Sequence, residues 1–298
     1  MPRSRRKGLQ LGYRLQAVRA RLLFWLFGML SLDKASEFGG WLARNFGPYT
    51  RAHRTAAFNL RKSLKYKYGR ELRILLTGMW DNIGRTLGEY PHLDRLMGDG
   101  ARVEVVDPAN ALVKLRDDGM GAVLVGMHSG NWALSTVPGF RVGLKQYYFF
   151  PTPDNPFIGR RIARMRDGMG QGGFLPEDAE ATELAAALLK ERAHIGMLVD
   201  QKQDDGIFMP FFGREAMVTT APASLALQYD LPILASRVVR LKRAKFRIYV
   251  EPVEAVRTGD READIVATTK LINSVMENWV RQNPAQWLWV AKRWPEEA

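Results

Sequence analysis

The hydrophobic pattern divides the chain into two parts. Up to about residue 97, apolar positions recur every three or four residues, which is typical of amphipathic helices. Gly, Pro and Asn residues interrupt this pattern, for example at 45–48. The pattern predicts helices near residues 8–31, 34–46, 50–66 and 70–97.

From about residue 102, short apolar runs alternate with helical stretches. The pattern predicts strands at 103–106, 122–127, 147–150, 195–199, 232–236 and 246–250, and helices at 108–117, 132–142, 156–168, 178–192 and 262–282. Such alternation favours the α/β class, with a mainly parallel sheet flanked by helices. Because neither an internal repeat nor a low-complexity linker is present, we expect one structural unit, with a helical N-terminal cap (1–97) and an α/β domain (98–298).

Composition narrows the chemistry. The chain has 298 residues, 46% of them hydrophobic, which suits an ordered globular protein. It has no cysteine, so disulfides, thiolate metal sites and cysteine nucleophiles are excluded. The four histidines, at 53, 92, 128 and 194, do not have the spacing of a metal-ligand set, and we expect no metal.

The positive charge is concentrated at one end. Residues 1–70 hold 16 Lys and Arg against Asp33 and Glu37, whereas the other 228 residues hold 28 basic and 29 acidic side chains. A localised positive field indicates an anionic partner, such as phospholipid, nucleic acid or an acidic carrier protein. No helix-turn-helix, zinc finger or aromatic RNA platform is recognisable, so we expect no nucleic acid.

An uncharged run of eleven residues, 22–32, lies within this basic end. It is too short to span a membrane alone, since spanning takes about twenty apolar residues. With Arg14, Arg19 and Arg21 before it, the run is typical of a helix that lies in the membrane interface; a buried core helix is the alternative. No small-residue cleavage site follows it, so we expect no removed signal and a position on the cytoplasmic face of the membrane.

His128 stands where a strand is predicted to end. Residues 121–127 form an apolar run, and Ser129, Gly130 and Asn131 form a polar turn before a helix. Sites in open α/β sheets lie outside the carboxyl ends of strands. A neutral imidazole there can take a proton from an alcohol, and backbone amides of the turn could donate to developing negative charge. The alternative is a structural histidine that caps the turn.

The segment from His128 to Trp132 resembles the signature of the late lipid A acyltransferases, the lauroyl and myristoyl transferases, and of relatives that acylate phosphatidylinositol mannosides. In that signature, four residues separate a histidine from an acid. The likeness continues in order over nearly the whole chain, through Asp154-Asn155-Pro156, the arginine-rich 160–166, Asp200-Gln201, 208–213 (expected as a loop), Thr219-Thr220, 284–289 and Arg293-Trp294.

This resemblance implies a fold like that of glycerol-3-phosphate acyltransferase and an enzyme that needs no cofactor. The enzyme would move a fatty acyl chain from acyl carrier protein or acyl-coenzyme A to a hydroxyl of a glycolipid, such as a lipid A precursor. It would work at the surface of the cytoplasmic face of the bacterial inner membrane. Transfer would be direct, because Ser129 lacks the setting of a nucleophile elbow.

The resemblance also assigns roles to residues. His128 is the expected general base, position 133 is that of the acid, and Asp200 is a further catalytic candidate. The expected substrate-binding residues are Asn131, Asn155, Arg164, Arg166 and Gln201. The corresponding structural interpretations are a solvated helix face for the two arginines, a turn cap for Asp200 and a turn former for Asn131. Aromatic residues that either line an acyl channel or belong to the core are Trp132, Phe211, Phe212, Trp287 and Trp289.

Position 133 departs from the signature, because it is alanine. Either a glutamate was replaced deliberately, or this relative uses another acid, with Asp200 the best placed by analogy. We favour the first explanation, since the rest of the motif is intact; it predicts that Ala133→Glu restores activity. Residues 149–153 and Lys202 also depart from the common pattern. Two alternatives therefore stay open: an acceptor that is another polar lipid, and a non-catalytic lipid-binding relative.

Overall fold

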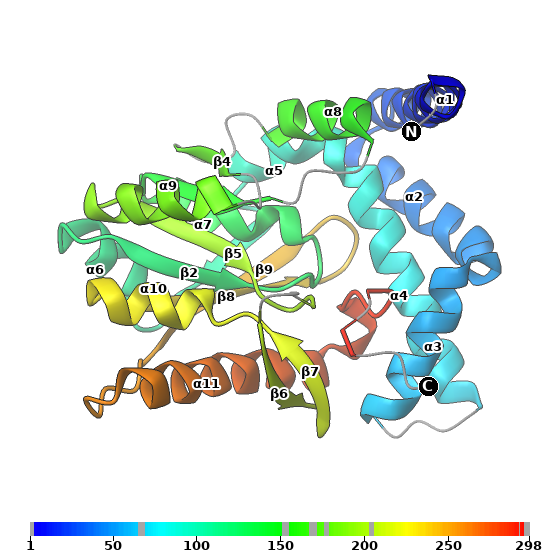
Figure 1. Cartoon of the computed structure of the whole chain (residues 1–298). Helices are drawn as coiled ribbons and strands as arrows, with labels where there is room; N and C mark the ends of the chain where they lie inside the picture. The colour runs from blue at the N-terminus through cyan, green and yellow to red at the C-terminus, as the bar shows by residue number, and fades with distance from the viewer. Residues whose placement is uncertain are drawn as a thin grey trace.

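The computed structural model describes residues 3–64, 69–150, 155–166, 172–175, 179–202, 206–291 and 293–294. A seven-stranded sheet lies at its centre with helices packed against it, and the N-terminal helices gather beyond one end of the strands (Figure 1). The predicted α/β class with a mostly parallel sheet is confirmed.

Helices occupy the first third of the chain, as the pattern predicted. They are α1 (Arg3–Met29), α2 (Leu32–Phe46), α3 (Arg51–Leu64), α4 (Arg70–Glu89) and α5 (Leu93–Gly98), with 3-10 turns η1 (Gly47–Tyr49) and η2 (Tyr90–His92) between them. The predicted helix 70–97 is interrupted at η2, where Pro91 has no N–H to donate to the preceding turn. Among the described residues, no helix is both long enough and apolar enough to cross a membrane.

The central sheet has the strand order β1-β9-β8-β2-β5-β3-β4. Its strands are β1 (Val103–Val106), β2 (Ala122–Gly126), β3 (Gln146–Phe149), β4 (Gly173–Leu175), β5 (His194–Leu198), β8 (Ile233–Arg240) and β9 (Phe246–Val253). Neighbours are parallel except β8 and β9, so β1 and β9 run opposite to the other five. All six predicted strands are present and begin within one residue of their predicted positions.

The remaining elements include several that the pattern did not predict. Strand β4, helix α10 (Ala221–Tyr229) and the hairpin of β6 (Ile207–Phe211) and β7 (Arg214–Val218) were missed. The expected loop at 208–213 is this hairpin, turned by Phe212 and Gly213, which both have positive φ. The other helices are α6 (Ala111–Asp117), η3 (Trp132–Thr136), α7 (Val137–Arg141), α8 (Pro156–Arg166), α9 (Ala179–Lys190), α11 (Arg261–Gln282) and η4 (Pro284–Gln286).

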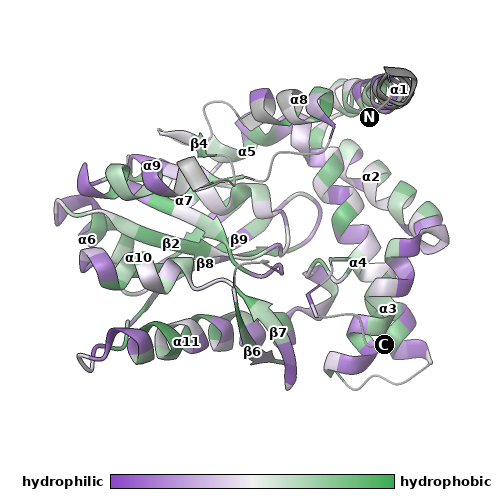
Figure 2. Ribbon diagram, viewed as in Figure 1, coloured by the Kyte–Doolittle hydropathy of each residue, from purple (hydrophilic) through white to green (hydrophobic). Residues whose placement is uncertain are grey.

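Strand β2 is covered on both faces. Val123 and Val125 belong to the largest hydrophobic cluster, with side chains of α9, α10 and α11, whereas Ala122 and Leu124 pack with α6 on the other face. Burial on both faces explains why its sequence is continuously apolar, seen as green ribbon in Figure 2. The division into a helical cap (1–97) and an α/β domain (98–298) within one structural unit stays a prediction.

Helices α2 and α4 touch through their backbones. A Cβ built on Gly84 would overlap the carbonyl oxygen of Gly39, and one built on Gly88 would overlap that of Ala35. Only glycine allows this approach, which fixes α4 against α2. Because α4 also contacts the turn after His128, the helix pair supports that turn.

The close approach generates a stability prediction. We expect Gly84→Ala to lower the free energy of unfolding by about 1–3 kcal/mol, because the added methyl group forces the helices apart. Gly98→Ala is the matched control, since nothing lies within 4 Å of its added Cβ. Chemical denaturation of both variants checks this; equal midpoints would contradict the packing described.

Candidate active site

His128 and Asp200 are brought together by strand register. Strands β2 and β5 are parallel neighbours in which Gly126 pairs with Leu198. His128 and Asp200 each stand two residues beyond those ends, and the Val199 amide still donates to the carbonyl of Gly126 at 3.0 Å. The two side chains therefore meet at the carboxyl edge of the sheet, where sites of open α/β folds form.

Asp200 is held by three donors. Its Oδ1 lies 2.8 Å from His128 Nδ1, while its Oδ2 accepts from the His128 backbone N–H at 2.9 Å and from Trp287 Nε1 at 2.7 Å. The residue is 3% exposed. Burial by itself would raise the pKa of Asp200, but the His128 charge and the hydrogen bonds from His128 and Trp287 outweigh it, and the pKa lies below its usual value.

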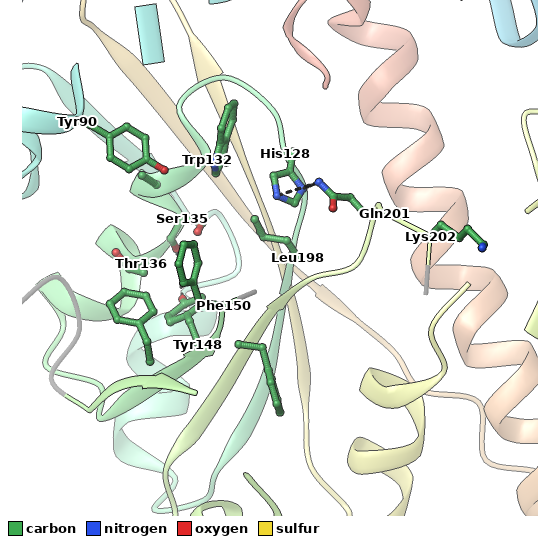
Figure 3. A pocket seen from close by; sticks show the side chains of 13 residues that line it. Tyr90, His128, Trp132, Ser135, Thr136, Tyr148, Phe150, Leu198, Gln201 and Lys202 are labelled. Atoms are coloured by element: carbon green, nitrogen blue, oxygen red, sulfur yellow. Dashed lines mark hydrogen bonds between the residues drawn. The ribbon is translucent and has the colours of Figure 1, made fainter. Parts of the chain in front are cut away.

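These contacts fix how His128 is protonated when it is neutral. An ionised carboxylate can only accept hydrogen bonds, so Nδ1 carries the proton and Nε2 keeps a lone pair. The imidazole is partly exposed and borders a pocket (Figure 3). Gln201 Nε2 lies 3.4 Å from both ring nitrogens. This arrangement suits a general base.

The pocket beside His128 encloses about 180 Å³. Figure 3 shows its side chains, which are those of Tyr90, His128, Trp132, Ala133, Ser135, Thr136, Tyr148, Phe149, Phe150, Phe174, Leu198, Gln201 and Lys202. Six of the thirteen are aromatic rings other than histidine, so much of the wall is suited to an apolar ligand. Burial raises the pKa of Tyr148, which therefore keeps its hydroxyl proton.

The C-terminal segment clamps the pair from the other side. Gly130 N–H donates to the carbonyl of Gln286 at 3.1 Å, and Leu288 N–H donates to that of His128 at 3.1 Å. Arg293, 1% exposed, donates to the carbonyl of Gln201 at 2.7 Å. Burial lowers the pKa of Arg293 to about 10, and the charge of Asp200 opposes this. Arg293 is therefore a buried cation that favours the ionised form of Asp200.

Helix α4 holds the turn that follows His128. The Gly130 carbonyl accepts from Asn82 Nδ2 at 2.9 Å and from Thr86 Oγ1 at 3.1 Å. Gly130 has φ +56°, and a Cβ there would overlap the Val238 carbonyl oxygen, so the turn requires glycine. The fully buried Glu89 accepts from Asn131 Nδ2 at 2.8 Å.

A buried cation balances Glu89. Arg240 forms an ion pair with it through two nitrogens and also donates to Asn82 Oδ1 at 2.8 Å. Ser36 Oγ donates to Glu89 at 2.6 Å, which joins α2 to the same network. Removing either charge would leave the other unpaired in the interior, which would lower the stability of the fold.

Asn131 and position 133 lie differently with respect to the pocket: Ala133 lines it and Asn131 does not. Asn131 is fully buried, and its side chain is bonded to Glu89 and to the Ala133 N–H at 3.2 Å, so it shapes the turn and does not line the pocket. Ala133 is 3% exposed and packs with Leu134 and Val137. Asp200 occupies His128 Nδ1, and both explanations of Ala133 stay predictions.

The other residues expected to bind substrate do not lie together in one site. Asn155 is buried, accepts from the Phe157 N–H at 3.1 Å at the start of α8, and donates to the Tyr13 carbonyl at 2.9 Å. This supports a helix cap that ties α8 to α1 rather than a substrate contact. Arg164 is exposed on α8, and the Arg166 side chain lies outside the described residues. Gln201 lines the pocket.

The turn amides and most of the aromatic candidates also have structural roles. The N–H groups of Ser129 and Gly130 already donate to carbonyls, so they are not free to stabilise an oxyanion. Trp132 lines the pocket. The other aromatic candidates belong to the buried core: Phe211, Phe212, Trp287 and Trp289.

Sequence reasoning missed several supporting residues. Glu89 and Arg240 carried no local signal, because their partners are distant in the chain and a buried ion pair resembles surface charge in sequence. Arg293 and Trp287 were noted within family motifs, yet their contacts with the Asp200 loop follow only from the fold. No group of three or more His, Asp or Glu side chains that could hold a metal occurs in the described part of the chain.

The geometry defines an α/β protein with a histidine–aspartate pair at the edge of an aromatic-lined pocket. The model of the bacterial lipid A biosynthesis acyltransferases matches residues 12–296, and the chain belongs to that family. No curated protein matches the sequence. Among solved structures, the 1-acyl-sn-glycerophosphate (LPA) acyltransferase PlsC from Thermotoga maritima is similar over 86% of this chain and 99% of its own, with 15% identity and a TM-score of 0.38.

The lowered pKa of Asp200 generates a pH prediction. Its ionised form is favoured by folding, so this stabilisation is complete above the ordinary aspartate pKa of 3.8 and is lost as the pH falls through the lower folded pKa. We expect Asp200→Asn to lower the free energy of unfolding at pH 6 by roughly 1–3 kcal/mol. The difference from wild type should narrow below about pH 4.

Urea denaturation at several pH values measures this difference. The exposed Asp94→Asn is the control, with an expected change within about 0.5 kcal/mol. A difference between Asp200→Asn and wild type that stays constant down to pH 2 would argue against an ionised buried carboxylate.

Proposed function

We propose that this acyltransferase moves a fatty acyl chain from a thioester, carried on acyl carrier protein or coenzyme A, to a hydroxyl of a glycolipid such as a lipid A precursor. The observation that carries this proposal is the His128–Asp200 pair, which leaves Nε2 at the border of an aromatic-lined pocket. Family membership supports acyl transfer to lipid. The donor and the acceptor are our inference.

In the proposed step, His128 Nε2 takes the proton of the acceptor hydroxyl as its oxygen attacks the thioester carbonyl. Asp200 stabilises the imidazolium ion that forms, because it is held ionised beside Nδ1. The carbon–sulfur bond then breaks, and the imidazolium ion returns the proton to the leaving thiolate. No acyl-enzyme is needed, and no cofactor takes part. Gln201 Nε2 lies 3.4 Å from His128 Nε2, and as an amide donor it is suited to the carbonyl oxygen of the thioester.

The acceptor is the less constrained part of the proposal. Phe149, Phe150 and Lys202, where the chain departs from the common family pattern, all border the pocket. Another polar lipid as acceptor is therefore the second candidate. Arg164, exposed on α8, stays a candidate for an anionic group of either substrate. A non-catalytic lipid-binding relative is disfavoured, since a protein that only binds lipid does not need a buried carboxylate bonded to a histidine at its pocket.

The catalytic pair predicts how two variants behave. Asp200→Asn should lower kcat by about two to four orders of magnitude, because an amide no longer fixes the tautomer or stabilises the imidazolium ion. Ala133→Glu should not increase kcat, since His128 Nδ1 already bonds to the carboxylate of Asp200. Both are measured by thioester consumption with an acceptor lipid, with Asp94→Asn as control. A large gain from Ala133→Glu would restore the explanation that a glutamate is missing at 133.

We also propose that α1 docks the enzyme on the cytoplasmic face of the inner membrane. The apolar run on this helix has two sides. Phe24 and Phe27 are buried against the protein, whereas Leu22 and Trp25 are 61% and 60% exposed. Arg14 and Arg19, also exposed, precede them. Exposed apolar side chains beside cations suit an anionic membrane surface.

Docking is tested by replacing the exposed side chains alone. Leu22→Asp with Trp25→Asp should reduce binding to vesicles containing phosphatidylglycerol at least about tenfold, because the apolar contact is lost. Val113→Asp, an exposed position on α6 at the far end of the molecule, is the control (Figure 1). Flotation of the double variant equal to that of wild type would contradict docking through α1.

A further inference from the structure

A second hollow lies between α3 and the first half of α4, apart from the His128 pocket. It encloses about 450 Å³ and shares no lining residue with the first. Its wall includes Leu72, Leu76 and Trp80, and two arginines, Arg61 and Arg73, also line it. An apolar wall with cations beside it is suited to a ligand that has both a hydrocarbon part and a negative charge.

The Trp80 wall is rigid. Its Nε1 donates to His53 Nδ1 at 3.0 Å, and the two rings lie 15° from parallel. A Cβ at Gly47 would overlap the indole ring, so the backbone of η1 rests directly against it. Burial lowers the pKa of His53, and Nδ1 already accepts a hydrogen bond. The wall is therefore neutral and preformed, and the positive charge of the hollow comes from the arginines.

The surface around the hollow is strongly basic. Within 51–64 and 69–80, Glu71 is the sole acidic residue. Against it stand six exposed cations: Arg51, Arg54, Arg61, Lys62, Arg70 and Arg73. Arg73 forms no ion pair within the described residues. Such a surface attracts anions over several ångströms, whatever the shape of the partner.

Neighbouring aromatic residues distinguish between a membrane and an acidic protein. Phe46 and Tyr49, on either side of the hollow-lining Pro48, are 62% and 88% exposed. Exposed aromatic rings beside cations are typical of membrane–water interfaces, where the ring lies at headgroup level. The apolar hollow, its cations and these rings together favour a bilayer lipid.

We propose that this hollow binds one anionic phospholipid of the membrane, with an acyl chain against Leu72, Leu76 and Trp80 and the phosphate at Arg61 and Arg73. The site is separate from the transfer reaction and does not depend on its substrates. It differs from docking through α1, because it takes a single lipid and selects for charge.

A unique thiol reports on this site. Since the chain has no cysteine, Thr77→Cys places one label at the exposed edge of the hollow. A polarity-sensitive fluorophore there should report saturable binding of lysophosphatidylglycerol below its critical micelle concentration. The same fluorophore at Ile74→Cys, exposed on α4 outside the hollow, should not respond. Neutral lysophosphatidylcholine should bind at least about tenfold more weakly, because it brings no net charge to the arginines.

A matched pair of charge reversals tests the role of Arg73. Arg73→Glu should weaken lysophosphatidylglycerol binding at least about tenfold, whereas Arg70→Glu, with the same charge change one turn earlier outside the hollow, should change it less than about threefold. Circular dichroism melting confirms folding, and Arg73→Gln replaces Arg73→Glu if the reversal unfolds the chain. Equilibrium dialysis of the unlabelled variants gives the same comparison if the label fills the hollow.

Four outcomes would overturn the proposal. Equal losses from the two reversals would indicate a general field effect. Equal binding of the neutral lysolipid would contradict recognition of the anionic headgroup by the arginines. Full displacement of the lysolipid by inorganic phosphate at equal concentration would contradict binding of the acyl chain in the hollow. A response to an acidic carrier protein without a response to lysophosphatidylglycerol would assign the surface to a protein. None of these results bears on catalysis by His128.

Discussion

A carboxylate removed from water has to be compensated by donors, and at Asp200 these donors come from the groups that form the site. His128 supplies two of them and Trp287 the third. The same contacts that keep the carboxylate ionised fix the imidazole with its proton on Nδ1. Satisfying the buried charge and preparing the base are therefore one structural event, and the chemistry proposed here depends on it.

The rest of the fold serves to hold that pair. Parallel register places the two side chains opposite each other, while α4 and the C-terminal segment bind the turn after His128 from two directions. The glycine contacts between α2 and α4 and the Glu89–Arg240 ion pair make this support stiff. A base positioned by rigid elements loses little entropy when substrate binds. The N-terminal helices thus support the site as well as forming a candidate membrane surface.

Six of the seven strands of the main sheet, and the position of His128 at a strand end, could be predicted from the sequence, because an apolar run followed by a polar turn is a local pattern. The hairpin at 207–218 could not, since Pro210 and Gly213 resemble a loop. The sequence offered Asp200 as a candidate by analogy, but no local pattern shows that it contacts His128. Residue 133 is near His128 in sequence, whereas Asp200 is 72 residues away and is brought to His128 by strand register. Glu89, Arg240 and Arg293 depend in the same way on contacts that no local pattern encodes.

The central claim is that neutral His128 carries its proton on Nδ1 and presents an unprotonated Nε2 at the border of the pocket. Nitrogen-15 NMR of the four histidine rings, with His128 assigned through His128→Ala, tests this directly. The account predicts a protonated Nδ1 and an unprotonated Nε2 in the neutral ring. Asp200→Asn should lower the population of this Nδ1-protonated tautomer. A neutral ring protonated at Nε2 would contradict it, because that nitrogen could then accept no proton from an acceptor hydroxyl.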